Sequence, residues 1–486
     1  MISLNIQQKL YIGLQFVFDL VEPKSAYGRE KLRTAQPFTP SQQNELQRHL
    51  DNIEKTLLYR PGFESEYKRI EGLFAQVKDI RKSIQKCKND SLGEIDLFEI
   101  KCYLLQLKEI MPLFEYINNK ANYNGIVFYD LTEALKLLDP ELNNIATFHI
   151  SNRYSAELAR IREGKKDIEK QIQQFLFKDV PAELFQQRQN LVLEEQQEEQ
   201  KIIRELSCKL EQYAVKMLNN ADAIGELDLI IQKASLAQKY GADKPVICKN
   251  IVSFVDMLNP QVASQLQKQG KTFTPITIEL GKGATLITGA NMGGKSVTLA
   301  TAALNIALIH YAFYPFAAKS SSPLFDFIHL LSGDLESKEH GLSSFGGQII
   351  KFKEIIQDIT KGLGCVLIDE FAHSTNPDEG AAIVQGITEY LNDSDSFSLL
   401  STHYDKVAER VNVHYQIAGL KQLNFEKLKQ ETDSLDNNDK LQHINQYMDY
   451  NLVVTDKKQK PPQEALNICR LLGMPSNVID NIKKYY

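Results

Sequence analysis

Hydrophobic positions in the first half of the chain recur with helical spacing. From residue 1 to about residue 145, apolar residues come three or four positions apart, which is typical of amphipathic helices that share a core. Between about residues 151 and 220, apolar positions become sparse in a charged, Gln-rich background. This pattern predicts two long helices that form an antiparallel, coiled-coil-like lever, interrupted at residues 177–183.

The second half alternates short β-prone runs with helical stretches. The predicted strands are Thr274–Leu280, Thr285–Thr288, Cys365–Ile368 and Ser398–Ser401. Such alternation predicts a mostly parallel sheet flanked by helices, that is, an α/β domain. We therefore expect a helical core and lever domain at residues 1–225, an α/β nucleotide-binding domain at 226–420, and a polar insertion followed by a C-terminal helical segment at 421–486.

Composition narrows the class of protein. The chain has 486 residues, too many for one compact core, and its net charge of −6 provides no general attraction to nucleic acids or anionic membranes. Six scattered cysteines form no Cys-x-x-Cys pair, so neither a zinc site nor a disulfide framework is indicated. The N-terminus lacks signal-peptide features, and the apolar stretch 297–318 is expected to be a buried helix. We expect a cytoplasmic protein without a membrane partner.

One glycine-rich turn carries the strongest chemical signal. It follows a predicted strand, precedes an Ala-rich helix and fits G-x-x-x-x-G-K-[ST], a loop whose backbone N–H groups surround phosphates. Lys295 is expected to reach the β- and γ-phosphates of ATP, and Ser296 to bind Mg²⁺. The expected nucleotide-binding residues are Gly289, Ala290, Asn291, Met292, Gly293, Gly294, Lys295, Ser296 and Val297.

Hydrolysis requires further groups, and two strand ends supply candidates. Asp369 and Glu370 follow an apolar strand, where α/β domains place their ligands. Asp369 is expected to hold Mg²⁺ through water, and Glu370 to act as the general base. His403 follows another strand and is expected to sense the γ-phosphate. The alternatives are a pair of surface charges and a structural histidine. Residues 374–380 are expected to form a turn-rich loop that meets a partner protomer.

Four motifs together resemble one family. TGANMGGKS, CVLIDE, STNPDEG and STHY, in this order, resemble the ATPase domain of the MutS family within the ABC-type ATPases. Ser343 stands where that family has its signature serine, which reaches the γ-phosphate bound by the other protomer. The resemblance implies a homodimer, or a heterodimer with a related subunit, with two composite ATP sites. Tyr27-Gly28-Arg29 also resembles a family segment.

The chain departs from the family in several places. By this resemblance we expect it to begin near the family's helical core, without the mismatch-recognition and connector domains, and only the interruption at residues 177–183 stands where a clamp domain is usual. We also expect no nuclease tail. Ala290 and Val297 replace the usual Pro and Thr of the phosphate loop.

Three functions therefore stay open. The first is a MutS-like, ATP-gated dimer of the DNA repair, mismatch repair and recombination class, which hydrolyses ATP and binds DNA without a mismatch reader of its own. The second is an ATP-dependent remodelling factor for a protein client, such as a reactivase for a cobalamin-dependent aminomutase, which the acidic charge favours. The third is a nucleotide-gated dimer with negligible turnover.

Overall fold

A computed structural model describes most of the chain, namely residues 4–87, 92–175, 180–289, 293–333, 344–372, 375–419, 449–455, 466, 469–470 and 472–484. It divides into two units. The sheet-containing unit comprises Met1–Val21, Ala35–Asp51 and Lys233–Tyr486, and the helical unit comprises Glu22–Thr34 and Asn52–Gln232. The polar insertion expected after residue 420 lies outside the described residues.

Two early segments belong to the sheet-containing unit, which the helical pattern of the sequence did not indicate. Phe38 N donates a 2.7 Å hydrogen bond to His310 O, and the Tyr314 hydroxyl donates to Leu50 O at 3.1 Å. Such bonds satisfy buried backbone groups between segments far apart in sequence. The expected boundary near residue 225 stays a prediction.

The helical unit is built from helices of very different length. Its core contains the 28-residue helix α7 (Glu94–Ala121), whose apolar positions, including Leu97, Ile100 and Leu104, are buried. Helix α4 (Gln43–Tyr59) and helix α11 (Ala214–Tyr240) each cross the division between the units. The other helices of this unit are α3 (Ala26–Arg33), η2 (Arg60–Gly62), α5 (Glu64–Gln76), α6 (Arg81–Cys87), α7 (Glu94–Ala121), α8 (Thr132–Leu138), α9 (Ala156–Gln173) and α10 (Ala182–Glu211).

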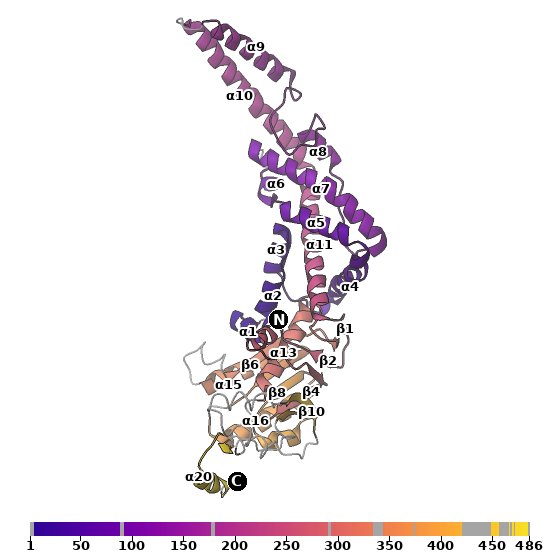
Figure 1. Cartoon of the computed structure of the whole chain (residues 1–486), viewed down its shortest axis with the longest axis vertical. Coiled ribbons are helices and arrows are strands. Elements are labelled where there is room, and N and C mark those ends of the chain that lie inside the picture. Colours follow the sequence, from indigo (N-terminus) through magenta and orange to yellow (C-terminus); the bar gives the residue numbers. More distant parts are fainter. Residues whose placement is uncertain are drawn as a thin grey trace. The chain divides into compact units, whose positions relative to one another are not determined.

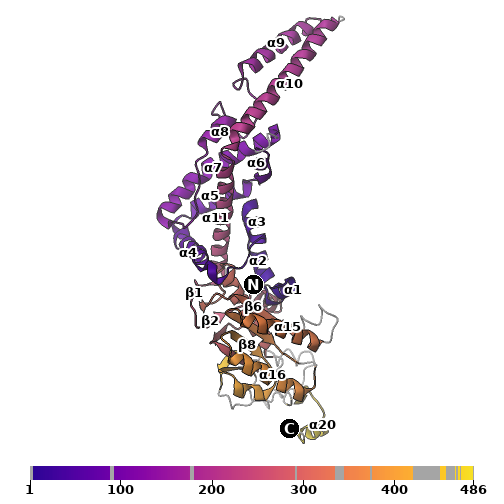
Figure 2. The same cartoon turned by 180° about the vertical axis from the view of Figure 1, so that it is seen from behind.

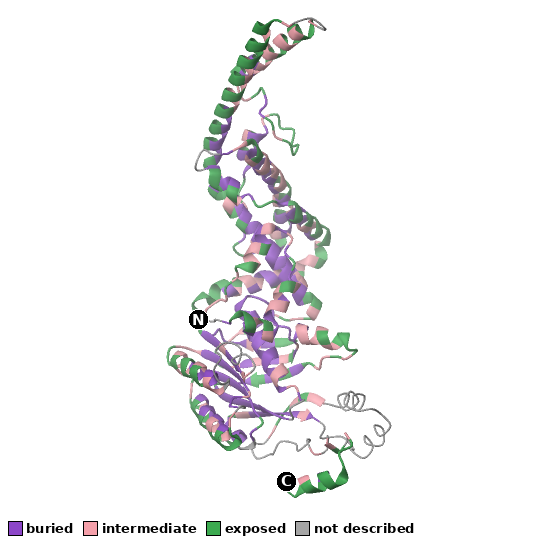
Figure 3. Cartoon of the chain, turned by 90° about the vertical axis from the view of Figure 1, so that its left-hand side faces the viewer, coloured by how far each residue is buried: buried purple, intermediate pink, exposed green. Residues whose placement is uncertain are grey.

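Helices α9 and α10 occupy the stretch for which the sequence predicts a lever, and they lie side by side in Figures 1 and 2. Arg162 connects them through hydrogen bonds to Glu195 at 2.8 Å and Glu199 at 2.7 Å. Lys165 also pairs with Glu195. Figure 3 shows mostly exposed surface along this pair. Because little apolar surface is buried there, the ion pairs help to set the alignment of the two helices.

The segment Tyr27-Gly28-Arg29 marks a close approach between α3 and α11. Asp228 accepts hydrogen bonds from Ser25 N at 2.7 Å and from Ser25 Oγ at 2.7 Å. A Cβ on Gly28 would lie 2.5 Å from Asp228 Oδ2, and one on Gly225 would lie 3.0 Å from the Tyr27 backbone. Only glycine fits such distances, so this motif has a packing role within the helical unit.

The sheet-containing unit has two sheets. A four-stranded sheet has the order β1-β5-β2-β3, and a six-stranded sheet has the order β10-β9-β4-β8-β7-β6. In the larger sheet every neighbouring pair is parallel except β10 with β9. The strands are β1 (Val246–Ile247), β2 (Val252–Met257), β3 (Ile276–Leu280), β4 (Gly283–Thr288), β5 (Lys319–Ser322), β6 (Phe327–Ser332), β7 (Gly364–Asp369), β8 (Phe397–Ser401), β9 (Val413–Gly419) and β10 (Asp449–Val454). The predicted mostly parallel α/β domain is confirmed.

Helices cover both faces of the larger sheet, whose strands are largely buried in Figure 3. One face packs Val366 and Ile368 of β7 with Ile355 of helix α15 (Ser344–Ile359) and Val384 of helix α16 (Pro377–Asn392). Helix α13 contacts β7 and β8 but contributes nothing to this cluster, so it covers the other face. The remaining elements of this unit are α1 (Ile6–Ile12), α2 (Leu14–Leu20), η1 (Pro40–Gln42), α12 (Pro260–Lys268), α13 (Lys295–His310), α15 (Ser344–Ile359), α16 (Pro377–Asn392), η3 (Asp405–Arg410) and α20 (Ser476–Lys483).

Helix α13 covers only the first part of the apolar stretch at residues 297–318. It ends at His310, ahead of Pro315, and 14 of its 16 residues are buried. Among the described residues, no helix combines the length and the apolarity needed to cross a lipid bilayer.

Candidate functional site

The register of three parallel strands brings the predicted site residues to one edge of the sheet. Ile287 of β4 pairs with Ser401 of β8, and Ser401 pairs with Asp369 of β7. The chain segments that leave these strands therefore start next to one another. This arrangement follows from parallel pairing, which places all carboxyl ends at the same edge.

Two glycines shape the turn between β4 and α13. Gly289 has φ +146° and Gly294 has φ +90°, values that residues with a Cβ rarely adopt. Helix α13 begins at Lys295 immediately after this turn, with Ser296 and Val297 half-buried in its first turn. The first backbone N–H groups of a helix have no acceptor within the helix itself, so this helix start can face an anion. Gly293 is buried, whereas Ala290, Asn291 and Met292 lie outside the described residues.

Lys295 is buried between the turn and the acidic strand end. Its Nζ donates a 2.9 Å hydrogen bond to Gly289 O and lies 3.7 Å from Glu370 Oε1. Burial lowers the pKa of Lys295 below its ordinary value, while the charges of Glu370 and Asp369 act in the opposite direction. The ammonium group therefore lies next to two carboxylates in a site largely shielded from water.

Both carboxylate oxygens of Asp369 accept hydrogen bonds from hydroxyl groups. Ser401 Oγ donates to Oδ1 at 2.5 Å, and the Tyr11 hydroxyl donates to Oδ2 at 2.9 Å. Sequence reasoning placed Ser401 only in a strand and missed Tyr11. No motif signals a tyrosine 358 positions away, because its part in the site depends on tertiary packing.

Glu370 has a left-handed backbone, with φ +49°, directly after β7. Its N–H donates to Ser401 O at 3.2 Å. Two residues later Ala372 is also left-handed, with φ +57°, and its N–H donates to Gln348 Oε1 at 3.0 Å. Non-glycine residues adopt this conformation only when their surroundings hold them there. The backbone turn thus directs the Glu370 side chain toward Lys295.

Three other predicted features have different outcomes. His403 lies two residues after β8, exposed, with its ring 4.3 Å from that of Tyr404. Ser343 lies outside the described residues. The prediction of a loop through residue 380 is wrong, because α16 already begins at Pro377, with the Asn376 side chain accepting from Asp378 N. Asn before Pro at a helix start is a known capping arrangement.

The described groups fit a magnesium–triphosphate complex. The Asp369 carboxylate and the Ser296 hydroxyl are hard oxygen ligands of the kind Mg²⁺ prefers. Lys295, the turn glycines and the start of α13 provide positive charge and N–H donors for phosphates. Both ligand types occur at the same sheet edge, as such a complex requires.

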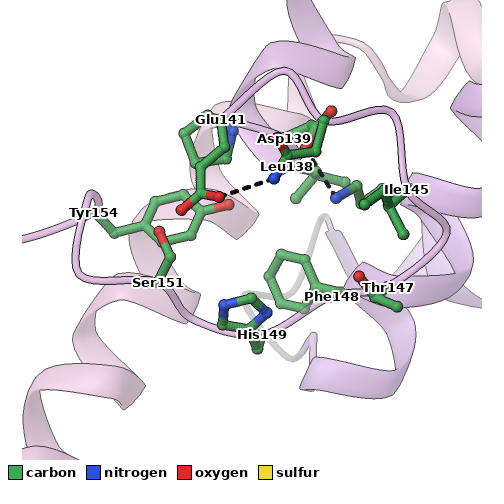
Figure 4. Close-up of a pocket in the computed structure, with 12 residues that line it drawn as sticks. Leu138, Asp139, Glu141, Ile145, Thr147, Phe148, His149, Ser151 and Tyr154 are labelled. Atoms are coloured by element: carbon green, nitrogen blue, oxygen red, sulfur yellow. Dashed lines mark hydrogen bonds and ion pairs between the residues drawn. The ribbon is translucent and has the colours of Figure 1, made fainter.

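The helical unit contains a small pocket that, unlike the sheet edge, is lined by a buried ion pair whose charges are already satisfied (Figure 4). Its lining includes His149 and Tyr154, together with a buried ion pair in which Lys101 Nζ lies 3.1 Å from Asp139 Oδ1. Asp139 Oδ2 accepts a further hydrogen bond from Asn144 N at 2.8 Å. Because these bonds satisfy the charges of Lys101 and Asp139, the ion pair has a structural role and suggests no chemistry at this pocket.

Comparison with known proteins agrees with the geometry of the sheet edge. Residues 285–485 match the family model of MutS domain V. Proteins named Endonuclease MutS2 are similar over wider stretches: the one from Lactobacillus johnsonii is 29% identical over 65% of this chain and 43% of its own length. Those from Geobacillus sp. and Clostridium kluyveri are 32% and 33% identical, over 48% and 45% of this chain and 29% and 27% of theirs.

Residues 285–485 are thus similar to the ATPase domain of the MutS family, and wider stretches of the chain are similar to MutS2 proteins. The matched residues lie in the sheet-containing unit, whose mostly parallel sheet agrees with an ABC-type ATPase domain. The chain spans less than half the length of the MutS2 proteins it matches. The activity and partners of those whole proteins are therefore matters for proposal here.

Proposed function

We propose that this chain binds and hydrolyses ATP as a Mg²⁺-dependent dimer whose nucleotide state controls an interaction with DNA. The carrying observation is the 3.7 Å approach of Lys295 Nζ to Glu370 Oε1, beside the hydrogen-bonded Asp369. Phosphate-binding and hydrolytic groups from separate parts of the sequence thus share one site. The MutS domain V match to this region supports the proposal.

The phosphates of ATP bind against the turn from Gly289 to Ser296. Backbone N–H groups and Lys295 hold the β- and γ-phosphates, and the buried position of Lys295 strengthens its attraction for them. Ser296 and Asp369 would hold Mg²⁺, which would supply positive charge to neutralise the phosphates. In this role the Lys295 ammonium group gives up its hydrogen bond to Gly289 O and binds phosphate oxygens instead.

Glu370 acts on the water molecule that attacks the γ-phosphate. Its carboxylate is 30% exposed, compared with 2% for the Lys295 side chain, so water can reach it. The backbone turn held by Ser401 O fixes where this carboxylate lies. It accepts a proton from the attacking water, while His403 contacts the γ-phosphate and responds to its loss.

The test is a pair of matched charge-neutral variants. Glu370→Gln should abolish phosphate release while leaving ATP bound, because the amide keeps the shape but cannot take a proton. Glu354→Gln, at an exposed position of α15, should hydrolyse at the wild-type rate. Unchanged phosphate release by Glu370→Gln would refute the role of Glu370 as the general base. Undiminished ATP binding by Lys295→Ala would refute the assignment of the ATP-binding site.

Dimerisation follows from the family resemblance, in which Ser343 completes the partner's site. We expect specific activity to rise with protein concentration as dimers form. Ser343→Arg should remove this dependence and most turnover, while the affinity for ATP measured on monomer stays near wild type. Complete loss of ATP binding by the variant would contradict the assignment.

DNA is the partner that the comparisons favour over a protein client. The MutS2 relatives are named endonucleases, an activity directed at nucleic acid. The lever carries exposed basic side chains on α9, at Arg160, Lys166 and Lys170, although α10 is rich in acidic residues. Contact with phosphates through such groups predicts an affinity that falls steeply with salt.

The DNA part is tested with duplex and branched oligonucleotides at about 50 mM salt, using the Glu370→Gln variant with and without ATP. Fluorescence anisotropy should show ATP-dependent binding that weakens when Arg160, Lys166 and Lys170 are replaced by Gln. Replacing Lys353 and Lys361, which are exposed on α15 and just after it, by Gln controls for the loss of positive charge. Absence of binding in every condition would refute the DNA interaction and return the remodelling alternative to consideration.

A further inference from the structure

Helix α1 contacts the catalytic edge of the sheet at two points. The Tyr11 hydroxyl donates a 2.9 Å hydrogen bond to Asp369 Oδ2. Three residues earlier, Gln8 is buried, and its Nε2 donates a 2.9 Å hydrogen bond to Leu330 O of β6. β6 is an edge strand of the larger sheet as described. One short helix thus connects the edge strand with the carboxylate expected to hold Mg²⁺.

Both ends of α1 are fixed in place. At its start, Asn5 and Gln8 form a capping box, which satisfies the first free N–H groups. At its end, Gly13 adopts φ +87°, and Asn259 Nδ2 donates a 3.0 Å hydrogen bond to Ile12 O. A Cβ on Gly13 would lie 3.0 Å from Asn259 Oδ1. Tyr11 is therefore presented to Asp369 from a well-supported helix.

The two hydroxyl donors restrict the Asp369 carboxylate. Rotation about the last side-chain bond of aspartate is ordinarily loose, but here Ser401 holds Oδ1 and Tyr11 holds Oδ2. Each carboxylate oxygen has about two acceptor positions, so both bonds are compatible with a cation or its water on the same group. A carboxylate already oriented loses less freedom when it binds.

We propose that Tyr11 is a positioning residue that orients Asp369 for Mg²⁺, and that the docking of α1 is thereby coupled to the binding of Mg²⁺ and nucleotide. The inference rests on the proposed ATP-binding function. Coupling is reciprocal: if docked α1 favours the metal complex, that complex must favour docked α1. The chain leaves the sheet-containing unit directly after α2, at Val21. Helix α1 therefore lies close in sequence to the point where the chain passes into the helical unit.

The decisive variant is Tyr11→Phe, which removes the hydroxyl and keeps the ring. Its matched control is Tyr314→Phe, since the Tyr314 hydroxyl bonds to Leu50 O within the same unit. Binding of a fluorescent ATP analogue is measured while Mg²⁺ is titrated, and again in EDTA. Tyr11→Phe should need about ten-fold more Mg²⁺ for half-maximal binding, the size expected for one hydrogen bond to a charged group, with unchanged affinity in EDTA.

Hydrogen exchange gives a second readout that does not involve turnover. In the wild type, Mg²⁺ with a slowly hydrolysed ATP analogue should increase the protection of residues 6–12, and Tyr11→Phe should lose this increase. Gln8→Ala, which removes both the bond to β6 and the capping box but keeps the Tyr11 hydroxyl, should shift the Mg²⁺ titration in the same direction by a smaller factor.

Two results would overturn the inference while leaving the proposed function intact. One is nucleotide binding by Tyr11→Phe with the wild-type Mg²⁺ dependence. The other is an equal loss of affinity with and without Mg²⁺, which would show a merely structural role. A wild-type chain that binds no nucleotide would instead overturn the proposed function, and this inference with it.

Discussion

Ser401 Oγ lies 2.5 Å from Asp369 Oδ1 and donates a hydrogen bond to it between neighbouring parallel strands. The same residue also accepts, through its backbone carbonyl, the N–H of Glu370 at 3.2 Å. One serine on β8 thus bonds to both acidic residues, Asp369 at the end of β7 and Glu370 directly after it. Because the two strands pair in exact register at this point, any shift of Ser401 displaces the proposed metal ligand and the proposed base together.

Ser401→Ala should therefore lower the rate of ATP hydrolysis more than the affinity for ATP. We expect kcat to fall about 10- to 150-fold, since removing a hydrogen bond to a charged group typically costs about 1.5–3 kcal/mol. Steady-state phosphate release checks this value. Ser398→Ala is a close control: this serine is buried on the same strand, and within the described residues its hydroxyl has no hydrogen-bond partner. Equal effects of the two substitutions would contradict the argument.

Gln348 should be important because it holds the turn that follows Glu370. It is buried on α15, and Oε1 accepts the N–H of left-handed Ala372 at 3.0 Å. Gln348→Leu leaves that buried N–H without a partner, which should cost about 1–3 kcal/mol of unfolding free energy. Urea denaturation measures the loss, and a parallel fall in kcat is expected.

Gln348→Glu is the matched variant, since a carboxylate oxygen can still accept the Ala372 N–H. It should recover part of the activity lost in Gln348→Leu, whereas the burial of a charge at this 2% exposed position has its own cost in stability. If Gln348→Leu is as stable and as active as the wild type, the turn does not depend on this bond.

The sequence allowed the residues gathered at the sheet edge to be predicted, because the signals that point to them are local. The turn after β4 and the acidic end of β7 each follow an apolar run, and parallel pairing brings such ends together. Tyr11 and Gln348 could not be found this way, since each acts through a long-range contact with no local pattern. The start of α16 was missed for a different reason: Asn376-Pro377 was interpreted as turn chemistry, although the same residues also begin helices.

Strands were likewise found where burial on both sides gave continuous apolar runs, as in β4, β7 and β8. β5, with the sequence KSSS, and β10, which is only partly buried, have no such signal. They are strands because neighbouring strands supply their hydrogen bonds, which is tertiary information.

Two glycine substitutions should have opposite effects. Gly294 has φ +90°, and a Cβ there would lie 3.4 Å from the Tyr450 ring, so the backbone conformation is the main obstacle. Gly294→Ala should cost about 1–2 kcal/mol of stability and reduce ATP affinity. Gly386 lies exposed inside α16 with nothing near its Cβ position. Gly386→Ala should stabilise the protein by about 0.5–1 kcal/mol.

Thermal unfolding and ATP titration of both variants measure these effects. An equal change in melting temperature for the two glycines would show that neither the left-handed conformation nor helix propensity decides the outcome. Normal ATP affinity in Gly294→Ala would further show that phosphate binding does not require the left-handed backbone conformation at this position.

His310 should make the sheet-containing unit sensitive to acid. It is fully buried at the end of α13, with Nδ1 2.8 Å from Phe38 O, and Nε2 accepts the N–H of Phe325 at 3.3 Å. Burial lowers the pKa of His310 to about 4, although the bond to Phe38 opposes the shift. The neutral ring, with a proton on Nδ1, satisfies both bonds.

The sign of the pH effect follows from this lowered pKa. The unfolded chain, with an ordinary histidine pKa near 6.5, binds a proton at a higher pH than the folded chain does. The stabilising contribution is therefore complete above about pH 6.5 and is lost as the pH falls toward 4, by about 3 kcal/mol in all. His310→Gln keeps a donor and an acceptor but does not titrate, so its unfolding free energy should fall less over this range. Urea unfolding of both proteins between pH 4 and 7 measures the difference, and parallel curves would exclude His310 as the acid-sensitive group.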